Sequence, residues 1–260
     1  MLREKLIGKG IGYSKQFRWR SHEISRIEGL SDAVFAFAVT LLVVSLEVPK
    51  TFAELMETMR GFGAFAISFT LLFMVWFNQY KFFRRYGLQD NLTVCLNAIL
   101  LFVVLFYVYP LKFLFTLLVN LFTGGGGHVR LPGGTQRMMV ESSQQITTLM
   151  IIFGAGYIAV FGVFVLLYWH AYRRRATLEL NELEVFDTRK DIQESALNVG
   201  VGTLSVAIAA FGGGRFSFLA GMTYMLNAVV MPLHGMLMGR RRRKLEEQFV
   251  PGENAVLESN

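Results

Sequence analysis

The sequence predicts an all-α membrane protein with six transmembrane helices. Hydrophobic residues make up 53% of the 260-residue chain and charged residues only 17%, and the mean hydropathy is +0.42. Soluble domains carry about 25% charged residues, so this composition does not fit one. The apolar residues also fall in long runs separated by short charged segments, and about 20 apolar residues in a helix suffice to cross the hydrocarbon core.

The predicted spans follow one another with short connections. They cover residues 29–48, 61–80, 92–122, 147–171, 195–211 and 216–238. Pro110 interrupts the third run, which is tolerated where neighbouring helices satisfy the freed carbonyl. We expect a short amphipathic helix or loop over 50–60 and a flexible connector over 123–144. This divides the chain into a basic segment (1–25), a transmembrane domain (26–238) and a C-terminal tail (239–260).

The distribution of cations predicts the orientation in the membrane. Of the 26 Lys and Arg residues, 20 fall on the side of the two termini and six on the other side. Cytoplasmic loops carry such an excess, so we expect a multi-pass cell-membrane protein with both termini in the cytoplasm. The net charge of +7 then reflects orientation and contact with the lipid bilayer rather than binding to nucleic acid. The basic segment 1–25 is either an interfacial segment with aromatic anchors or a disordered tail.

The first apolar run has two distinct faces on a helical wheel. Bulky apolar side chains form one stripe, with a hydroxyl at its edge: Leu30, Phe37, Leu41, Val44 and Val48, with Thr40. Ser31 and Asp32 fall off this stripe, so they should face neighbouring helices and form hydrogen bonds there. The stripe either lines a pore or is ordinary packing between helices.

No motif for catalysis, a metal or a cofactor emerges. The histidines are scattered, and none pairs with another at i, i+4 beside a carboxylate: His22, His128, His170 and His234. No nucleophile–base pair is evident, so we expect a protein that is not an enzyme, has no catalytic residues and needs no cofactor. The glycine-containing runs at 10–14 and 154–158 lack the pore-helix context of a carbonyl-lined ion filter.

Several residues of the first span resemble the first-helix signature of the transmembrane protein 175 family of potassium channels. These are Arg26, Leu30, Ser31 and Asp32, followed by Ala38, Thr40 to Leu42, and Pro49. Trp76, Asn97 and Pro110 are similar to landmarks of that family. The resemblance implies a homotetramer of six-span subunits, in which the first helix of each subunit lines a central pore for K⁺.

The same resemblance implies roles for individual residues. It assigns the narrowest, apolar part of the pore to Phe37, a hydroxyl ring to Thr40, and positions beyond them to Leu41 and Val44. It also assigns a polar clasp between the first three helices to Arg26, Leu30, Ser31, Asp32, Trp76 and Asn97. The chain departs from the family pattern at Leu30 (usually Phe), at Phe37 (usually aliphatic) and at Gln79 (commonly His).

The sequence therefore favours a potassium-preferring cation channel with a hydrophobic constriction on the first helix. An alternative is a secondary transporter or proton-coupled carrier that uses an intramembrane carboxylate, Asp32 or Glu28. This alternative predicts saturable, pH-driven uptake. A third possibility is a non-conducting membrane adaptor, which predicts no flux in any variant.

Overall fold

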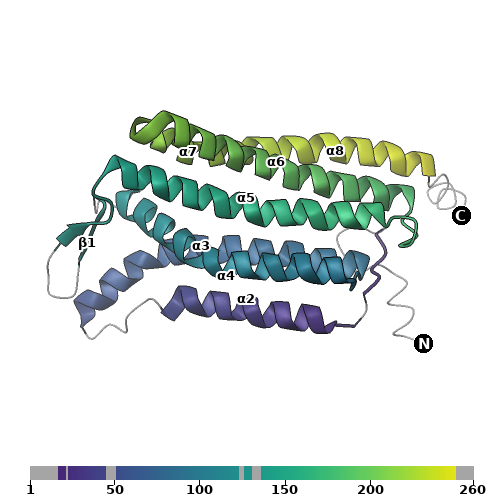
Figure 1. Cartoon of the computed structure of the whole chain (residues 1–260), viewed down its shortest axis with the longest axis horizontal. Coiled ribbons are helices and arrows are strands. Elements are labelled where there is room, and N and C mark those ends of the chain that lie inside the picture. The colour runs from purple at the N-terminus through teal and green to yellow at the C-terminus, as the bar shows by residue number, and fades with distance from the viewer. Residues whose placement is uncertain (1–16, 22, 45–50, 123–125, 131–135, 250–260) are drawn as a thin grey trace, which may run out of the picture.

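A bundle of long helices makes up the computed structural model, which describes residues 17–21, 23–44, 51–122, 126–130 and 136–249. Six long helices run roughly along the long axis of the bundle (Figure 1): α2 (Arg26–Val44), α3 (Phe52–Tyr86), α4 (Asn91–Phe122), α5 (Ser143–Arg173), α6 (Glu182–Gly212) and α8 (Asn227–Phe249). A helix α7 (Ser217–Met222) lies between two 3₁₀ turns, η1 (Gly213–Arg215) and η2 (Thr223–Leu226). Two antiparallel strands, β1 (His128–Arg130) and β2 (Gln136–Met138), form a small hairpin that the sequence did not predict.

Among the described residues, four helical stretches are long and apolar enough to cross a membrane: Gly61–Tyr86, Asn91–Leu121, Ser143–Arg173 and Glu182–Gly212. They correspond to the second to fifth predicted spans. The first predicted span is α2, whose 19 described residues include three charged ones, and its apolar run continues into residues 45–48, outside the described part. The last predicted span is divided among α7, η2 and α8 instead of forming one helix.

Helices α3, α6 and α8 extend beyond the predicted spans, and α6 begins at Glu182 rather than near residue 195. Residues 52–60 are the first turns of α3, which is one helix of 35 residues and not a separate short element followed by a span. Helix α4 matches the third predicted span and continues through Pro110 to Phe122. Helix α8 runs without interruption across the predicted domain boundary at 238/239. Apolar periodicity therefore located the helices, while helix ends depended on contacts outside the apolar runs.

Two hydrophobic clusters hold the bundle together. One joins α2, α3, α4 and α5, with Leu42, Leu100 and Leu167 fully buried. The other joins α4, α5, α6 and α7. Small residues let α5 and α6 approach closely: a methyl group at Gly202 would lie 2.9 Å from the Ile158 side chain. This agrees with the close packing that the small residues of the fifth predicted span indicated.

The basic segments gather at one end of the bundle. In Figure 1 the start of α2, the end of α3, the end of α5 and the end of α8 all lie at the right, whereas the hairpin lies at the left. Arg85 at the end of α3 pairs with Asp191 of α6 at 2.6 Å, and His170 of α5 contacts Asp90 at 2.9 Å. The uneven count of cations in the sequence thus corresponds to one basic end of the folded chain.

Part of the basic N-terminal segment is built into this end. The ring of Phe17 is 3% exposed and packs edge-on against Tyr86, with the ring centroids 5.7 Å apart. The backbone N–H of Arg20 donates to the carbonyl of Arg84 at 3.1 Å. Residues 17–21 are therefore packed against the bundle, which neither alternative from the sequence foresaw. The preceding residues, 1–16, lie outside the described part.

Candidate functional site

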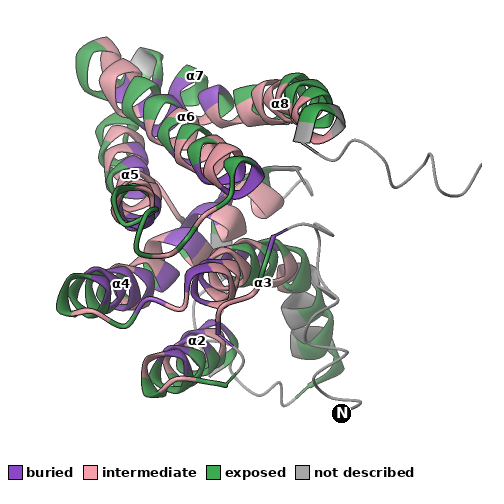
Figure 2. Ribbon diagram, turned by 90° about the vertical axis from the view of Figure 1, so that its right-hand side faces the viewer, coloured by how far each residue is buried: buried purple, intermediate pink, exposed green. Residues whose placement is uncertain are grey.

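Helix α2 lies at one edge of the bundle, on the opposite side from α7 and α8 (Figures 1 and 2). Its inner face is buried, with Ser31, Ala38 and Leu42 fully covered. Its outer face is open: Leu30 is 61% and Phe37 56% exposed. Leu30 and Phe37 are therefore not core residues of the single chain.

The other predicted pore residues differ in their surroundings. Thr40 is exposed, and its hydroxyl donates to the carbonyl of Ala36 at 2.8 Å within the helix. Leu41 is partly buried and packs against the first hydrophobic cluster. The side chain of Val44 lies outside the described part of the chain. The open face of α2 thus carries Phe37 and Thr40, with Leu41 at its border.

The start of α2 is fixed by a reciprocal cap. The backbone N–H of Glu28 donates to the hydroxyl of Ser25 at 3.2 Å, and the backbone N–H of Ser25 donates to the Glu28 carboxylate at 3.1 Å. This is a capping box, in which the residue before the helix and the third helical residue satisfy each other's free N–H groups. The sequence contains the Ser-x-x-Glu signature at the required place. Sequence reasoning considered Glu28 only as a titrating group and missed this role.

The middle of α2 is fixed by a buried chain of amides and a hydroxyl. Gln79 of α3 donates through Nε2 to Asn97 Oδ1 of α4 at 2.9 Å, and Asn97 donates through Nδ2 to Ser31 Oγ at 2.9 Å. The Ser31 hydroxyl in turn donates to the carbonyl of Ile27 at 2.8 Å. Gln79 and Asn97 are each 2% exposed and Ser31 is fully buried. Because buried polar groups are costly without partners, this series of hydrogen bonds holds three helices together in one register.

A second polar contact joins α2 to α3 beside these hydrogen bonds. The indole Nε1 of Trp76 donates to Asp32 Oδ1 at 2.8 Å. Together the two contacts bring four of the six predicted clasp residues into hydrogen bonds between helices: Ser31, Asp32, Trp76 and Asn97. Arg26 and Leu30 are exposed, and neither joins the network in the described part of the chain. Gln79, which the sequence marked only as a departure from the family, is a full member of it.

The far end of α2 is held by a lysine from α4. Lys112 Nζ donates to the carbonyl of Leu42 at 2.6 Å. The last carbonyls of a helix lack partners within the helix and carry partial negative charge, so a cation there is stabilising. Sequence reasoning missed this contact because the two residues are separated by 70 positions.

The chain that leads into α2 is itself attached to α6. Arg20 Nη2 lies 2.6 Å from Glu184 Oε2, and the backbone N–H of Arg18 donates to Glu184 Oε1 at 2.8 Å. Glu184 is fully buried and also accepts from the backbone N–H of Asn181 at 3.1 Å, closing a capping box at the start of α6. One carboxylate therefore caps α6 and holds the segment that precedes α2.

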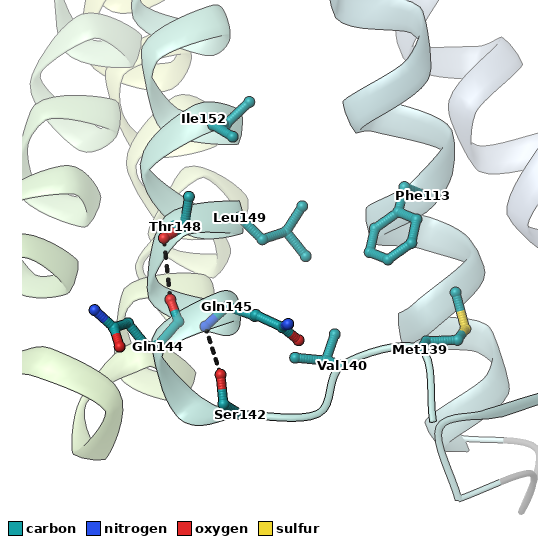
Figure 3. A pocket seen from close by; sticks show the side chains of 9 residues that line it. All are labelled: Phe113, Met139, Val140, Ser142, Gln144, Gln145, Thr148, Leu149 and Ile152. Atoms are coloured by element: carbon teal, nitrogen blue, oxygen red, sulfur yellow. Dashed lines mark hydrogen bonds between the residues drawn. The ribbon is translucent and has the colours of Figure 1, made fainter. Parts of the chain in front are cut away.

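A hollow of about 650 Å³ lies at the other end of the bundle, between α4 and the start of α5. Apolar side chains and a few amides and hydroxyls line it (Figure 3): Phe113, Met139, Val140, Ser142, Gln144, Gln145, Thr148, Leu149 and Ile152. The Ser142 hydroxyl accepts from the N–H of Gln145 at 3.3 Å, so it serves as a helix cap. No carboxylate, histidine or cysteine lines this hollow, and the described residues contain no cluster of three or more potential metal ligands.

Comparisons with known proteins agree with one another. The model of the family "Endosomal/lysosomal potassium channel TMEM175" matches residues 26–107, which include α2, α3 and the first half of α4. The chain is 40% identical over 238 residues to a potassium channel of Marivirga tractuosa, a match that covers 90% of this chain and 96% of that protein. It is 31% identical over 106 residues to a potassium channel of Chamaesiphon minutus, covering 38% of this chain and 52% of that protein.

Two solved structures have folds similar to that of this chain. The fold is similar to a crystal structure of a variant of the potassium channel MtTMEM175, in complex with a nanobody–MBP fusion protein. That match has a TM-score of 0.77 and 40% identity, and covers 88% of this chain and 100% of the other. A homologue from Chamaesiphon minutus shares the fold with a TM-score of 0.52 at 21% identity, over 85% of this chain and 99% of the other.

Proposed function

The chain belongs to the TMEM175 family, and on this premise we propose that it is a potassium-preferring cation channel whose conducting path is lined by α2. The observation that carries the proposal is the two-sided character of α2: an inner face anchored at its start, middle and end, and an outer face with Phe37 56% exposed. A membrane helix with one unpacked face is suited to meet copies of itself around a shared axis. The two curated relatives and the similar structure at 40% identity are described as potassium channels, which supports K⁺ as the permeant ion.

The assembly we propose is a homotetramer of six-span subunits in the cell membrane. The first and last spans would be α2 with the residues that follow it, and α7 with η2 and the first half of α8. The basic end of the bundle would face the cytoplasm, together with both termini, because cations accumulate on that side of membrane proteins. No cofactor is needed for this activity.

The proposed barrier to ions is a ring of Phe37 side chains. Four apolar rings around a narrow axis exclude water, and an ion crosses only when the ring widens and becomes wet. Thr40 lies on the same open face about one turn further along α2 and would offer hydroxyl groups to an ion. Leu41 and Val44 are the residues we assign to the path beyond the constriction.

A carrier that uses an intramembrane carboxylate is less well supported than a channel. Asp32 accepts a hydrogen bond from Trp76 at 2.8 Å, and Glu28 accepts from the backbone N–H of Ser25 at 3.1 Å. Both candidate carboxylates therefore have structural partners. Family membership also favours the channel over the carrier and over a non-conducting adaptor.

The test is K⁺ flux through purified protein in liposomes. Phe37→Ala should raise the flux because the smaller side chain leaves a wider and wetter ring. Phe102→Ala is the matched control, since Phe102 lies on α4 and is 72% exposed. Native mass spectrometry of each variant checks that the tetramer is retained. An unchanged flux in tetrameric Phe37→Ala would contradict the assignment of α2 to the path.

A further inference from the structure

We propose that Arg175 and Arg189 bind the phosphate group of an anionic membrane lipid at the basic end of α5 and α6. The two arginines come from different parts of the chain and meet on one aromatic ring. Their guanidinium carbons lie 4.8 Å and 5.1 Å from the ring centroid of Tyr172. The Nε of Arg189 also donates to the Tyr172 hydroxyl at 3.1 Å. One ring therefore positions both cations.

Among the described residues, no carboxylate pairs with either arginine. Since both guanidinium carbons lie near one centroid, they are no more than about 10 Å apart, within roughly one Debye length in 0.1 M salt. Neither arginine forms an ion pair with a carboxylate in the part of the chain that the structure describes, and both are exposed. Two like charges held this close repel each other, so an anion bound between them would be stabilising.

The depth of the pair in the membrane points to a lipid as the source of the phosphate. The apolar span of α5 ends at Arg173, one residue after Tyr172. Arg173 lies over the ring of Trp169 at 4.6 Å from its centroid, and Trp169 is 46% exposed. Tryptophan and arginine at the end of a span mark the level of the lipid headgroups. Lipid phosphates lie at that level of the membrane.

The chemistry of the pair suits a phosphate. The guanidinium group is planar and always charged, and it offers parallel N–H donors that match phosphate oxygens. The lipid should carry a net negative charge, because the pair supplies two positive charges and the described structure supplies no carboxylate partner for either. Phosphatidylglycerol meets this requirement, whereas phosphatidylcholine carries the same phosphate with a compensating cation.

The experiment measures lipid binding to the intact protein in detergent by native mass spectrometry. Short-chain phosphatidylglycerol and phosphatidylcholine are titrated separately against the wild type and against Arg175→Gln/Arg189→Gln. At about fivefold in affinity for each arginine that contacts the bound phosphate, the double variant should bind phosphatidylglycerol about 30-fold more weakly. Arg241→Gln/Arg243→Gln on α8 is the control, because it removes the same net charge from two other exposed arginines. Thermal unfolding of each variant shows that it is folded.

The expected result is preferential binding of phosphatidylglycerol that depends on Arg175 and Arg189 and changes less than threefold in the control. Tyr172→Phe removes the hydroxyl that orients Arg189 and should weaken binding by less than the double variant. Equal losses in the double variant and the control would mean that net charge alone attracts the lipid, and would overturn the proposal. Displacement of the lipid by inorganic phosphate at equal concentration would overturn the assignment to a lipid, as would unchanged binding by the double variant.

Discussion

The buried hydrogen bonds that link Gln79, Asn97 and Ser31 provide a quantitative test of how α2 is held. Asn97→Leu keeps the size of the side chain but removes the hydrogen bonds to Gln79 and Ser31, each 2.9 Å long. The Ser31 hydroxyl still donates to Ile27, whereas the Gln79 amide, 2% exposed, loses its partner. A hydrogen bond between membrane helices contributes about 0.6 kcal/mol, and an unsatisfied buried amide costs about 1–3 kcal/mol. The expected loss of stability is therefore about 2–4 kcal/mol.

The assay is thermal unfolding in detergent, followed by tryptophan fluorescence. A loss of about 2–4 kcal/mol corresponds to a decrease of roughly 4–16 °C in the unfolding temperature. The double variant Gln79→Leu/Asn97→Leu removes the orphaned amide as well, so it should recover at least about 1 kcal/mol relative to Asn97→Leu. Asn78→Leu is the matched control: Asn78 is half-buried, and its side chain has no hydrogen bond to other described residues.

Two outcomes would refute this reasoning. If Asn97→Leu unfolds within about 1 °C of the wild type, the polar chain contributes no net stability and its amides must have other partners. If the double variant is as unstable as Asn97→Leu, the loss comes from packing around position 97 and not from the unsatisfied amide of Gln79. Either result would also mean that these hydrogen bonds do not fix the register of α2.

Two further predictions concern the contacts at the ends of α2. Glu184→Ala leaves Arg20 without its carboxylate partner. Breaking a buried ion pair costs about 3–5 kcal/mol, which thermal unfolding would measure. The control Glu182→Ala, at an exposed neighbouring position, should change stability by less than about 0.5 kcal/mol. A loss for Glu184→Ala no larger than that of the control would contradict the proposed attachment of the N-terminal segment. Lys112→Met removes the charged donor to the Leu42 carbonyl, and a hydrogen bond to a charged group contributes about 1.5–3 kcal/mol. The last turns of α2 should therefore exchange amide hydrogens about 10–100-fold faster than in the wild type. Exchange in α5 is the internal control. Unchanged exchange in those turns would show that the helix end has another cap.

Local periodicity separated the apolar stripe of α2 from the polar residues that contact other helices. The helical wheel put Ser31 and Asp32 off the apolar stripe, and the structure gives both of them partners on neighbouring helices. It gives Phe37 an exposed position, whereas Leu41 of the same stripe packs against the first hydrophobic cluster. Periodicity carries this information because 3.6 residues per turn fix the direction of each side chain relative to its neighbours.

The contacts that anchor the ends of α2 were beyond sequence reasoning for two different reasons. Lys112 and Leu42 are separated by 70 positions, and Arg20 and Glu184 by 164, so only the packing of the helices brings them together. The capping box at Ser25 and Glu28 is a local signature that the sequence does display. A carboxylate at the edge of a membrane span also fits a titrating group, so the signature alone does not decide the role of Glu28. A single sequence therefore predicts which face of a helix is buried better than it predicts what holds the helix ends.

The anchors limit how the proposed path could open. Phe37 lies six residues after Ser31 and five before Leu42, which is about 9 Å and about 8 Å along the helix axis. Both of these residues are tied to other helices by hydrogen bonds, so the turns between them cannot bend or unwind alone without breaking one tie. Two movements leave the ties intact: a change of rotamer at Phe37, or a tilt of α2 together with the helices that hold it. A rotamer change needs only free space around the ring, and the outer face of α2 is open at that point within one chain. We therefore expect the Phe37 side chain, rather than the backbone of α2, to be the moving part of the barrier.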